Sequence, residues 1–494
     1  MPSLPLERRR RLSKSKLLSW LQCPKRLWLE IHRPQVAQPD EEAKRRFAVG
    51  HNVDEVARSL QPRGILIASV ENPDEAVRQT SERIEAAGSR VLFQPAFQHR
   101  GVLIRADILT KRGAGYELRE VKSSASVKPQ HYQDAAIQSW VLRGAKLKLD
   151  SVRIQHINTA FVYPGGGDYG KLFAAKAVDD EIRSLAKEVG KWADSARTTL
   201  AGKEPKIKTG KHCKDPYPCP CYSYCSGKEP QTKYPLSILP RAGKAVLKLI
   251  EEGYRDVREI PPGRLTGAQE RVRRITKSGR VELLPGAKKA VRALPYPRYY
   301  FDFETVQFAV PIWAGTRPYQ QIPFQWSCHI ERAPGKLEHQ GLLDTSGYPP
   351  MQAVAESLLR ALGDNGPILA HHDSFEKQRI EELANLVPKR ARELRKLIVR
   401  FIDTQGLARD YYYHPAMKGS WGLKNVLPTI APELDYEGLE HVQDGGEASA
   451  AYLEIIAPET PSERKRELRA ALERYCERDT FALVRMMRFF ATGK

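Results

Sequence analysis

Four of the seven cysteines of this 494-residue chain lie within fifteen residues, in the segment KHCKDPYPCPCYSYC at 211–225. Thiolates this close together bind soft metal ions or iron–sulfur clusters. The spacing C-x5-C-x-C-x3-C lacks the second close pair that zinc sites usually show, although a structural zinc ion is the alternative. An odd number of cysteines, most of them clustered, favours a reduced, cytoplasmic setting over a secreted disulfide framework.

The charge of the chain favours a polyanionic partner. The formal net charge is +21 and the pI is about 9.6, and the excess is spread over the whole chain. We therefore expect a nucleic acid as partner, the alternative being a soluble basic protein without one. No run of about 18 apolar residues occurs, and no apolar stretch follows the basic N-terminus, so we expect neither a membrane span nor a secretory signal.

The length suits two to four domains, and three regions differ in composition. The first, 1–228, opens with SKSKLLSWLQCPKRLWLEI, which predicts a helix capped by Ser13 or Ser15 and broken near Pro24. The second, 229–295, is short, basic and rich in predicted helices. Its glycine turns are reminiscent of helix-hairpin-helix modules, with a plain helical connector as the alternative. The third, 296–494, opens with a predicted strand and closes with a long predicted helix.

The first region contains two carboxylates and a lysine that a β-hairpin would bring together. VLIRADIL is apolar and β-branched, RGAG has turn residues and YELREVK alternates, which predicts a hairpin over 102–122. Glu120 and Lys122 share one strand face, and Asp107 on the neighbouring strand can join them. Such a set suits metal-assisted phosphodiester cleavage, in which carboxylates hold Mg²⁺ or Mn²⁺ and the lysine orients the attacking water. The alternative is an ordinary surface Glu/Lys pair.

These residues also resemble a known superfamily. The segments RAD and EVK are similar to the core of PD-(D/E)XK nucleases, in their RecB-like branch. The resemblance implies a restriction-endonuclease-like α/β/α core in which His51, on an upstream helix, completes the metal shell. It also implies that Gln138, on the following helix, orders the active site. Many members have a tyrosine four residues after that glutamine; this chain has Leu142 there, so we assign no tyrosine role.

The cysteines fit the same resemblance. RecB-like nucleases of the iron–sulfur type, including the AddB-like and CRISPR-associated branches, have one cysteine ahead of the core and three behind it, and a 4Fe-4S cluster joins the two ends of the domain. The resemblance implies four ligands here: Cys23, Cys213, Cys219 and Cys225. Cys221 is then the spare thiol. In an extended C-P-C stretch Cys219 and Cys221 would share a face, so geometry alone leaves Cys221 open as a ligand.

The last region carries a second acid pattern. RYYFDFETVQF predicts an apolar strand interrupted by Asp302 and Glu304, whose spacing puts both carboxylates on one face. Two like charges on an otherwise buried strand are costly unless a cation neutralises them, which predicts a metal site. The alternative is an edge strand with an acidic wet face. In the closing helix, Tyr475 and Asp479 are four residues apart and share a helix face.

With ILAHHDSFEKQRIEELA, an apolar strand end that runs into a helix, these acids resemble the DnaQ-like exonucleases of the RNase H-like fold, in their tyrosine (DEDDy) form. The resemblance implies four acids that bind two metal ions, a water positioned by Tyr475, and 3′–5′ cleavage. The family's middle motif has Asn, two residues, an aromatic residue and Asp. Here His372 takes the Asn position and Glu376 the Asp position, and the longer glutamate shifts the ion. Three further residues are weaker candidates for this site: Asp373, Asp403 and Lys424.

We therefore expect an α/β protein with an iron–sulfur PD-(D/E)XK domain over 1–228, a helical connector over 229–295 and a DnaQ-like domain over 296–494. The last domain also resembles an uncharacterised domain found C-terminal to RecB-like nucleases in bacteria and archaea. The expected substrate is single-stranded DNA or DNA ends, in repair, recombination or defence, with a helicase or other repair or defence proteins as partners. Two alternatives stay open: a nucleic-acid-binding scaffold with one or both sites inactive, and a nuclease that trims prespacers in CRISPR adaptation.

Overall fold

The structure, a computed structural model, describes residues 11–493 apart from 69–71, 87–89, 230, 242 and 435–437. It is a mixed α/β protein, as predicted, and its chain divides into two compact units. The N-terminal unit comprises Met1–Pro230 and Phe308–Tyr319, and the C-terminal unit comprises Gln231–Gln307 and Gln320–Lys494. We call the segment Phe308–Tyr319 the strap. No described helix is both long and apolar enough to cross a membrane.

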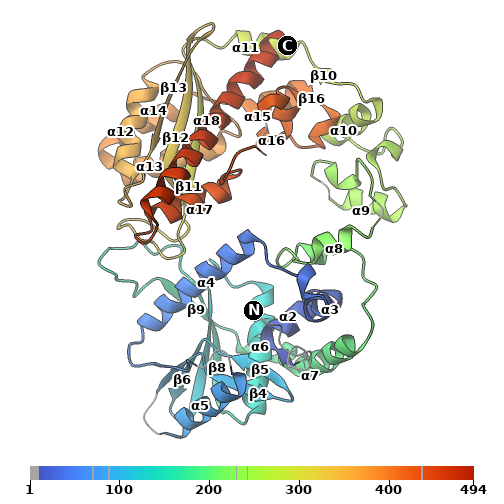
Figure 1. Cartoon of the computed structure of the whole chain (residues 1–494), viewed down its shortest axis with the longest axis vertical. Helices are drawn as coiled ribbons and strands as arrows, with labels where there is room; N and C mark the ends of the chain where they lie inside the picture. Colours follow the sequence, from blue (N-terminus) through green and yellow to red (C-terminus); the bar gives the residue numbers. More distant parts are fainter. Residues whose placement is uncertain are drawn as a thin grey trace. The chain divides into compact units, whose positions relative to one another are not determined.

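A six-stranded mixed sheet forms the centre of the N-terminal unit (Figure 1). Its strands, in spatial order, are β2 (Ile65–Leu66), β3 (Val91–Phe93), β6 (Ile108–Arg112), β7 (Gly115–Lys122), β8 (Leu149–Ile157) and β9 (Phe173–Ala177). The strands β7 and β8 are parallel, whereas β6 and β9 run antiparallel to their neighbours β7 and β8. A smaller sheet contains β1 (Leu12–Ser13), β5 (Val102–Arg105) and β4 (Ala96–His99).

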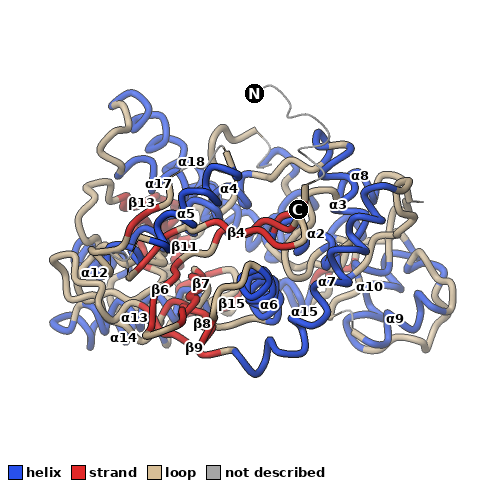
Figure 2. The backbone as a smooth tube through the Cα atoms, turned by 90° about the horizontal axis from the view of Figure 1, so that it is seen from below, coloured by secondary structure: helices blue, strands red, loops and turns tan. Residues whose placement is uncertain are grey.

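The helices of this unit are α2 (Lys14–Gln22), α3 (Pro24–His32), α4 (Glu41–Ser59), α5 (Pro73–Glu85), α6 (Pro129–Gly144), α7 (Asp179–Ala201) and α8 (Tyr222–Ser226). Figure 2 shows α6 beside β8, against which it packs. The predicted first helix is confirmed. Ser13 caps α2 by accepting a hydrogen bond from Lys16 N, and the chain breaks at Cys23 before Pro24 opens α3, because proline is tolerated in a first helical turn.

The predicted hairpin is confirmed only from residue 108 onward. The strands β6 and β7 pair antiparallel, with Ile108 opposite Arg119, but VLIRADIL is not one strand. It divides into β5 and β6, which belong to different sheets, and Asp107 lies in the bend between them. The Asp107 carboxylate accepts a hydrogen bond from Val121 N of β7 at 2.8 Å. At the break, this side chain therefore takes the place of the backbone acceptor that a continuous strand would offer to Val121.

The strap completes the core of the N-terminal unit. Ala309 and Val310 are buried with Phe161, Tyr163 and other apolar residues of the unit. Tyr163 N donates to Thr316 O at 2.9 Å and Gly315 N donates to Tyr163 O at 2.8 Å. Residues far along the chain are thus an integral part of this unit.

A five-stranded mixed sheet forms the centre of the C-terminal unit. Its spatial order is β13 (Lys336–Leu343), β12 (Ile322–Ala333), β11 (Arg298–Val306), β14 (Ile368–Ala370) and β15 (Phe401–Asp403). The strand β11 is antiparallel to β12 and parallel to β14. A two-stranded sheet pairs β10 (Glu282–Leu283) with β16 (Tyr412–Tyr413).

The helices of this unit are α9 (Lys244–Glu251), α10 (Gly267–Ser278), α11 (Gly286–Arg292), α12 (Met351–Leu362), α13 (Ser374–Leu386), α14 (Ala391–Ile398), α15 (Thr404–Tyr411), α16 (Leu423–Val426), α17 (Gly445–Ile456) and α18 (Ser462–Thr492). The long closing helix α18 occurs where the sequence predicts it. In Figure 1 it runs along the sheet, packed on β11 and β12.

The connector was predicted over 229–295, and its residues 231–295 pack with the C-terminal unit. Val257 and Val272 belong to the same buried cluster as Tyr300, Leu369 and Phe490, because the apolar faces of these short helices are covered by the strands and helices that follow. Three-residue 3-10 turns complete the described chain: Pro34–Val36, Lys211–Cys213, Leu236–Ile238, Val257–Glu259, Pro388–Arg390, Pro415–Met417, Leu427–Thr429 and Pro432–Leu434.

Candidate active sites

Glu120 is the centre of the acid site of the N-terminal unit. It is 1% exposed, and Lys122 on the same strand face donates to its Oε1 at 2.6 Å. Gln138 of α6 donates to Glu120 Oε2 at 2.6 Å and to Asp134 Oδ1 at 2.8 Å. The structure therefore brings together the predicted Glu120, Lys122 and Gln138, and adds Asp134 to them.

A second lysine reaches the same carboxylates from the start of α2. Lys14 Nζ lies 2.7 Å from Glu120 Oε1 and 3.1 Å from Asp134 Oδ1, while Lys122 Nζ lies 2.6 Å from Asp134 Oδ2. Two ammonium groups thus bridge two buried carboxylates. Burial raises the pKa of Glu120 to about 8, and the charges of Asp107 and Asp134 act in the same direction. Despite its burial, the pKa of Asp134 lies below its usual range because Lys122 and Lys14 stabilise its charged form.

Asp107 and the helix α4 border this site. Gln94 Nε2 lies 3.3 Å from Asp107 Oδ1. On α4, burial raises the pKa of Asp54, and the charge of Glu120 raises that pKa further. The Oδ1 atom of Asp54 is buried and has no hydrogen-bond partner among the described residues. His51 is exposed one helical turn before Asp54 and lowers the pKa of that carboxyl. The structure places His51 beside Asp54, and its part in a metal shell stays a prediction.

The structure gathers the cysteines from both ends of the N-terminal unit. Cys23 lies between α2 and α3, Cys213 ends a 3-10 turn and Cys225 lies in α8. Burial raises the pKa of Cys225, and the charges of Cys219, Cys213 and Cys23 raise it further, so the four predicted ligands influence one another. Gln22 Nε2 joins the end of α2 to this loop by donating to two of its carbonyl oxygens, at 2.7 and 2.8 Å.

Cys221, the predicted spare, is fully buried beside Cys219. The Cys221 thiol donates a hydrogen bond to the Cys219 sulfur, which lowers the pKa of Cys219 to about 6 and raises the pKa of Cys221. All of these cysteines are free thiols. Cys221 therefore contacts one predicted ligand directly and lies within the same loop.

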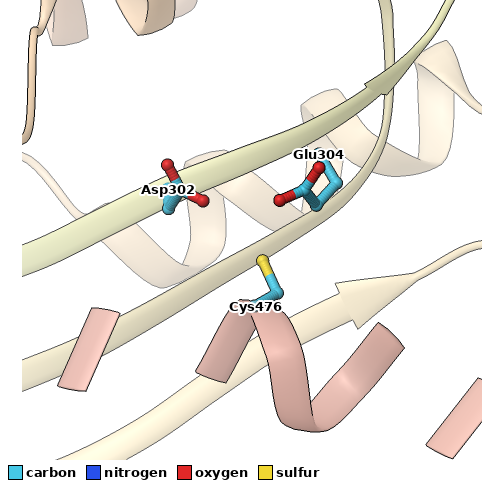
Figure 3. Close-up of side chains that lie close together, drawn as sticks. All are labelled: Asp302, Glu304 and Cys476. Atoms are coloured by element: carbon cyan, nitrogen blue, oxygen red, sulfur yellow. The ribbon is translucent and has the colours of Figure 1, made fainter. Parts of the chain in front are cut away.

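In the C-terminal unit, Asp302 and Glu304 lie on β11 and present their carboxylates on one side of the strand (Figure 3). Cys476 of α18 points toward them, and the ligand atoms of these three residues all lie within 4.8 Å of one another. Burial raises the pKa of both carboxyl groups well above its usual range, and the charge of Asp479 raises both further. The structure therefore brings the predicted Asp302 and Glu304 of β11 close to the predicted Asp479 of α18.

The predicted Tyr475 and Asp479 are buried on α18, 4% and 8% exposed respectively. Glu376, in the first turn of α13, is the fourth acid and is 3% exposed. Burial raises the pKa of Glu376 to about 8, and Glu376 Oε2 has no hydrogen-bond partner among the described residues. The charge of Glu376 also raises the pKa of Asp302, so all four acids belong to one site.

The weaker candidates make local contacts. Asp373 forms an ion pair with Lys377 at 2.6 Å. Asp403 caps α15 by accepting a hydrogen bond from Gln405 N at 2.9 Å, and it also accepts one from His372 N at 3.1 Å. Both carboxylates still raise the pKa of Glu376. Lys424 is exposed, hydrogen-bonds Gln443 O and lies over the Tyr475 ring, 5.2 Å from its centroid. Its charge lowers the pKa of Glu304.

Four residues of these sites were not predicted from the sequence: Lys14, Asp54, Asp134 and Cys476. The sequence does contain a pattern that points to Asp134, because it lies four residues before Gln138 and shares its helix face. Cys476 follows Tyr475 directly, and no pattern points to it, since the pair Tyr475 and Asp479 defines a face without it. Lys14 and Asp54 reach Glu120 from distant helices, and no local pattern marks them.

The comparisons cover parts of the chain. A family model described as "Domain of unknown function (DUF2779)" matches residues 299–422, which include Asp302, Glu304 and Glu376 and end before α18. The chain is also 26% identical over 216 residues to "Uncharacterized protein MG366 homolog" of Mycoplasma pneumoniae (strain ATCC 29342 / M129 / Subtype 1), which covers 40% of this chain. The matched part of this chain spans 32% of the length of that curated relative. Over residues 299–422 the chain is therefore similar to a domain whose function is unknown.

Proposed function

We propose that this protein is a metal-dependent nuclease with two active sites, acting on single-stranded DNA or DNA ends. The observation that carries the proposal is the convergence of Asp302, Glu304, Glu376 and Asp479 in the C-terminal unit. Ionising four carboxyl groups in one buried site costs free energy unless a cation is present. The raised pKa values of Asp302, Glu304 and Glu376 are consistent with this cost. Mg²⁺ or Mn²⁺ would offset that charge.

In the C-terminal site the four acids would hold the ions, and the ions would activate a water and stabilise the leaving oxygen of the phosphodiester. Glu376 fits a ligand because its Oε2 is buried without a described hydrogen-bond partner. Tyr475, one helical turn before Asp479, would position the water, and the exposed Lys424 would meet a substrate phosphate. Cys476 is a poor ligand for these hard ions and would pack beneath the carboxylates. From the resemblance to DnaQ-like exonucleases, we expect this site to cleave in the 3′–5′ direction.

In the N-terminal site Asp107 and Glu120 would hold the ion and Lys122 would orient the attacking water. Gln138 would fix Glu120, to which it donates at 2.6 Å. A 4Fe-4S cluster on Cys23, Cys213, Cys219 and Cys225 would join α2 and α3 to the segment after α7. A structural zinc ion on the same thiolates is the alternative.

One observation favours a second function for the N-terminal site. Lys14 and Lys122 together pair both Glu120 and Asp134, which leaves this site neutralised by ammonium groups rather than open to a cation. In that case the N-terminal unit would bind DNA without cleaving it, and the C-terminal unit would supply the activity. Prespacer trimming in CRISPR adaptation is compatible with either arrangement.

The test is degradation of end-labelled single- and double-stranded DNA and RNA with Mg²⁺ or Mn²⁺. Glu304→Gln should abolish stepwise 3′–5′ shortening, and Glu120→Gln should abolish the remaining cleavage. Glu473→Gln, on the exposed face of α18, and Glu181→Gln, at the exposed start of α7, are matched controls that should retain activity. If Glu304→Gln alone abolishes all cleavage and Glu120→Gln leaves rate and product pattern unchanged, the N-terminal unit is assigned to binding alone. Wild-type cleavage by the Glu120→Gln, Glu304→Gln double variant would overturn both assignments.

A further inference from the structure

The N-terminal unit has a cavity on the opposite face of its sheet from Glu120. Along β7, Glu120 and Lys122 point to the face covered by α6, whereas Glu117 and Arg119 point to the other face, because strand side chains alternate. The cavity has a volume of about 430 Å³ and lies between β6–β9 and the end of α4. It is therefore separate from the acid site and from the cysteine loop.

Positive charge dominates the strand side of this cavity. Arg112, Arg119 and Arg153, from three adjacent strands, approach the single lining carboxylate, Glu117, at 3.7, 2.6 and 3.2 Å. Three guanidinium groups against one carboxylate leave an excess of two positive charges among the lining residues. Arg153 Nε is buried and makes no hydrogen bond to any described group, although it lies 3.2 Å from Glu117 Oε2. The side chains of Arg112 and Arg153 are 57% and 39% exposed, so their guanidinium groups retain N–H donors for an anion.

The remaining walls are apolar and include one aromatic ring. Ala57 and Leu60 come from the end of α4, and Phe173 and Ala175 come from β9. A ligand that fits this lining carries negative charge at one end and a flat apolar group at the other. The volume lies within the range of about 300–1,000 Å³ that small-molecule sites occupy.

We propose that this cavity binds the phosphate of a nucleotide, either a free mononucleotide or the terminal nucleotide of a strand. Guanidinium groups match phosphate oxygens in pairs, and Glu117 keeps the three arginines oriented. The base would lie against Phe173 and Leu60. This inference does not rest on the proposed nuclease activity, since none of the residues involved belongs to either acid site.

The test measures binding to the full chain in EDTA, which keeps both acid sites without metal. Adenosine 5′-monophosphate is compared with adenosine, and a short oligothymidylate with a 5′-phosphate is compared with the same strand bearing a 5′-hydroxyl. We expect the phosphate to tighten binding about tenfold or more in at least one pair, as charge-assisted hydrogen bonds do. An effect in the first pair identifies a free nucleotide as ligand, and an effect in the second pair alone identifies a strand end.

Arg153→Gln should remove most of this phosphate dependence, and so should Arg112→Gln, whose side chain is 57% exposed and is not needed for packing. Arg183→Gln is the matched control, because Arg183 lies on α7 with its side chain 71% exposed. Equal binding of phosphorylated and unphosphorylated probes in both pairs would overturn the proposal. So would phosphate dependence that survives in Arg112→Gln and Arg153→Gln, which would make the arginines a purely structural ion-pair network.

Discussion

Lys14 and Glu120 are 106 residues apart in the chain, and the Lys14 ammonium donates to the Glu120 carboxylate at 2.7 Å. This contact joins the first turn of α2 to the centre of the six-stranded sheet. Burial alone would lower the pKa of Lys14, but Asp134 and Glu120 outweigh it and raise that pKa. Lys14 therefore stays charged and occupies the position at which a divalent cation would meet the same oxygen.

Lys14→Met should destabilise the metal-free protein and increase the rise in its unfolding temperature on adding Mn²⁺. Removing the ammonium leaves a buried carboxylate without one of its partners, which we expect to lower the free energy of unfolding by about 2 kcal/mol. Mn²⁺ should then raise the unfolding temperature more than in the wild type, because the ion no longer competes with Lys14. Lys191→Met, at a side chain 76% exposed on α7, is the control. A rise in unfolding temperature with Mn²⁺ no larger than in the wild type would show that Lys14 does not exclude the ion.

Cys23→Ala should remove the cluster, whereas Cys221→Ala should retain it. If the thiolates hold a 4Fe-4S cluster, the wild type should be brown, with broad absorption near about 400 nm and bound iron and sulfide. Cys23 is the one proposed ligand that comes from the α2–α3 end, so its loss should also separate these helices from the cysteine loop and lower the unfolding temperature. Colourless protein with stoichiometric zinc would contradict the cluster assignment.

Glu376→Gln should stabilise the metal-free protein and reduce its response to Mn²⁺. The substitution keeps the shape of the side chain and removes a carboxyl group that ionises readily in the unfolded chain but not when buried, which we expect to raise the free energy of unfolding by about 1 kcal/mol. Thermal unfolding with EDTA and with Mn²⁺ measures both effects, and Glu473→Gln on α18 should change neither. If Glu376→Gln destabilises the metal-free chain and keeps the full Mn²⁺ response, Glu376 is not a ligand.

His329 should make the C-terminal unit less stable in acid. It is 5% exposed on β12, and its Nδ1 lies 2.8 Å from Thr480 Oγ1 of α18. Burial lowers the pKa of His329 to about 4, and His339 and Arg488 act in the same direction. The unfolded chain therefore binds a proton that the folded chain excludes, so this contribution is present above about pH 6.5 and is lost as the pH falls toward 4.

The lost stability at the acid end is about 3 kcal/mol for this histidine. His329→Gln keeps a polar side chain that does not titrate, so unfolding by urea should change less between pH 7.5 and pH 4.5 than in the wild type. The same pH dependence in both proteins would show that other groups carry it.

Val310→Asp should release the strap from the N-terminal unit. Val310 is 5% exposed in the cluster with Phe161 and Tyr163, and burying an unpaired carboxylate there should cost about 3 kcal/mol or more. Limited proteolysis should then cut within 308–319. Ile312→Asp is the matched control, because Ile312 lies on the same segment but is 44% exposed, and it should resist cleavage. Equal cleavage of the two variants would contradict the role of Val310.

Local patterns predicted the parts of the sites that a single element contains. The period of a strand pairs Asp302 with Glu304 and Glu120 with Lys122, and Pro24 marks the break between α2 and α3. The break at Asp107 was not predictable, because it depends on Val121 N, which lies on another strand. Lys14 and the strap were missed for the same reason: each is defined by a partner far along the chain, and side-chain periodicity carries no information on such partners.

The strap also limits how this gene can be divided or recombined. The chain enters the N-terminal unit twice, and the second entry begins four residues after Glu304. A crossover near residue 230 would leave the upstream product without Ala309 and Val310, which its core requires, and would carry an orphaned apolar segment into the downstream product. The two units should therefore be inherited, expressed and exchanged between genomes as one piece.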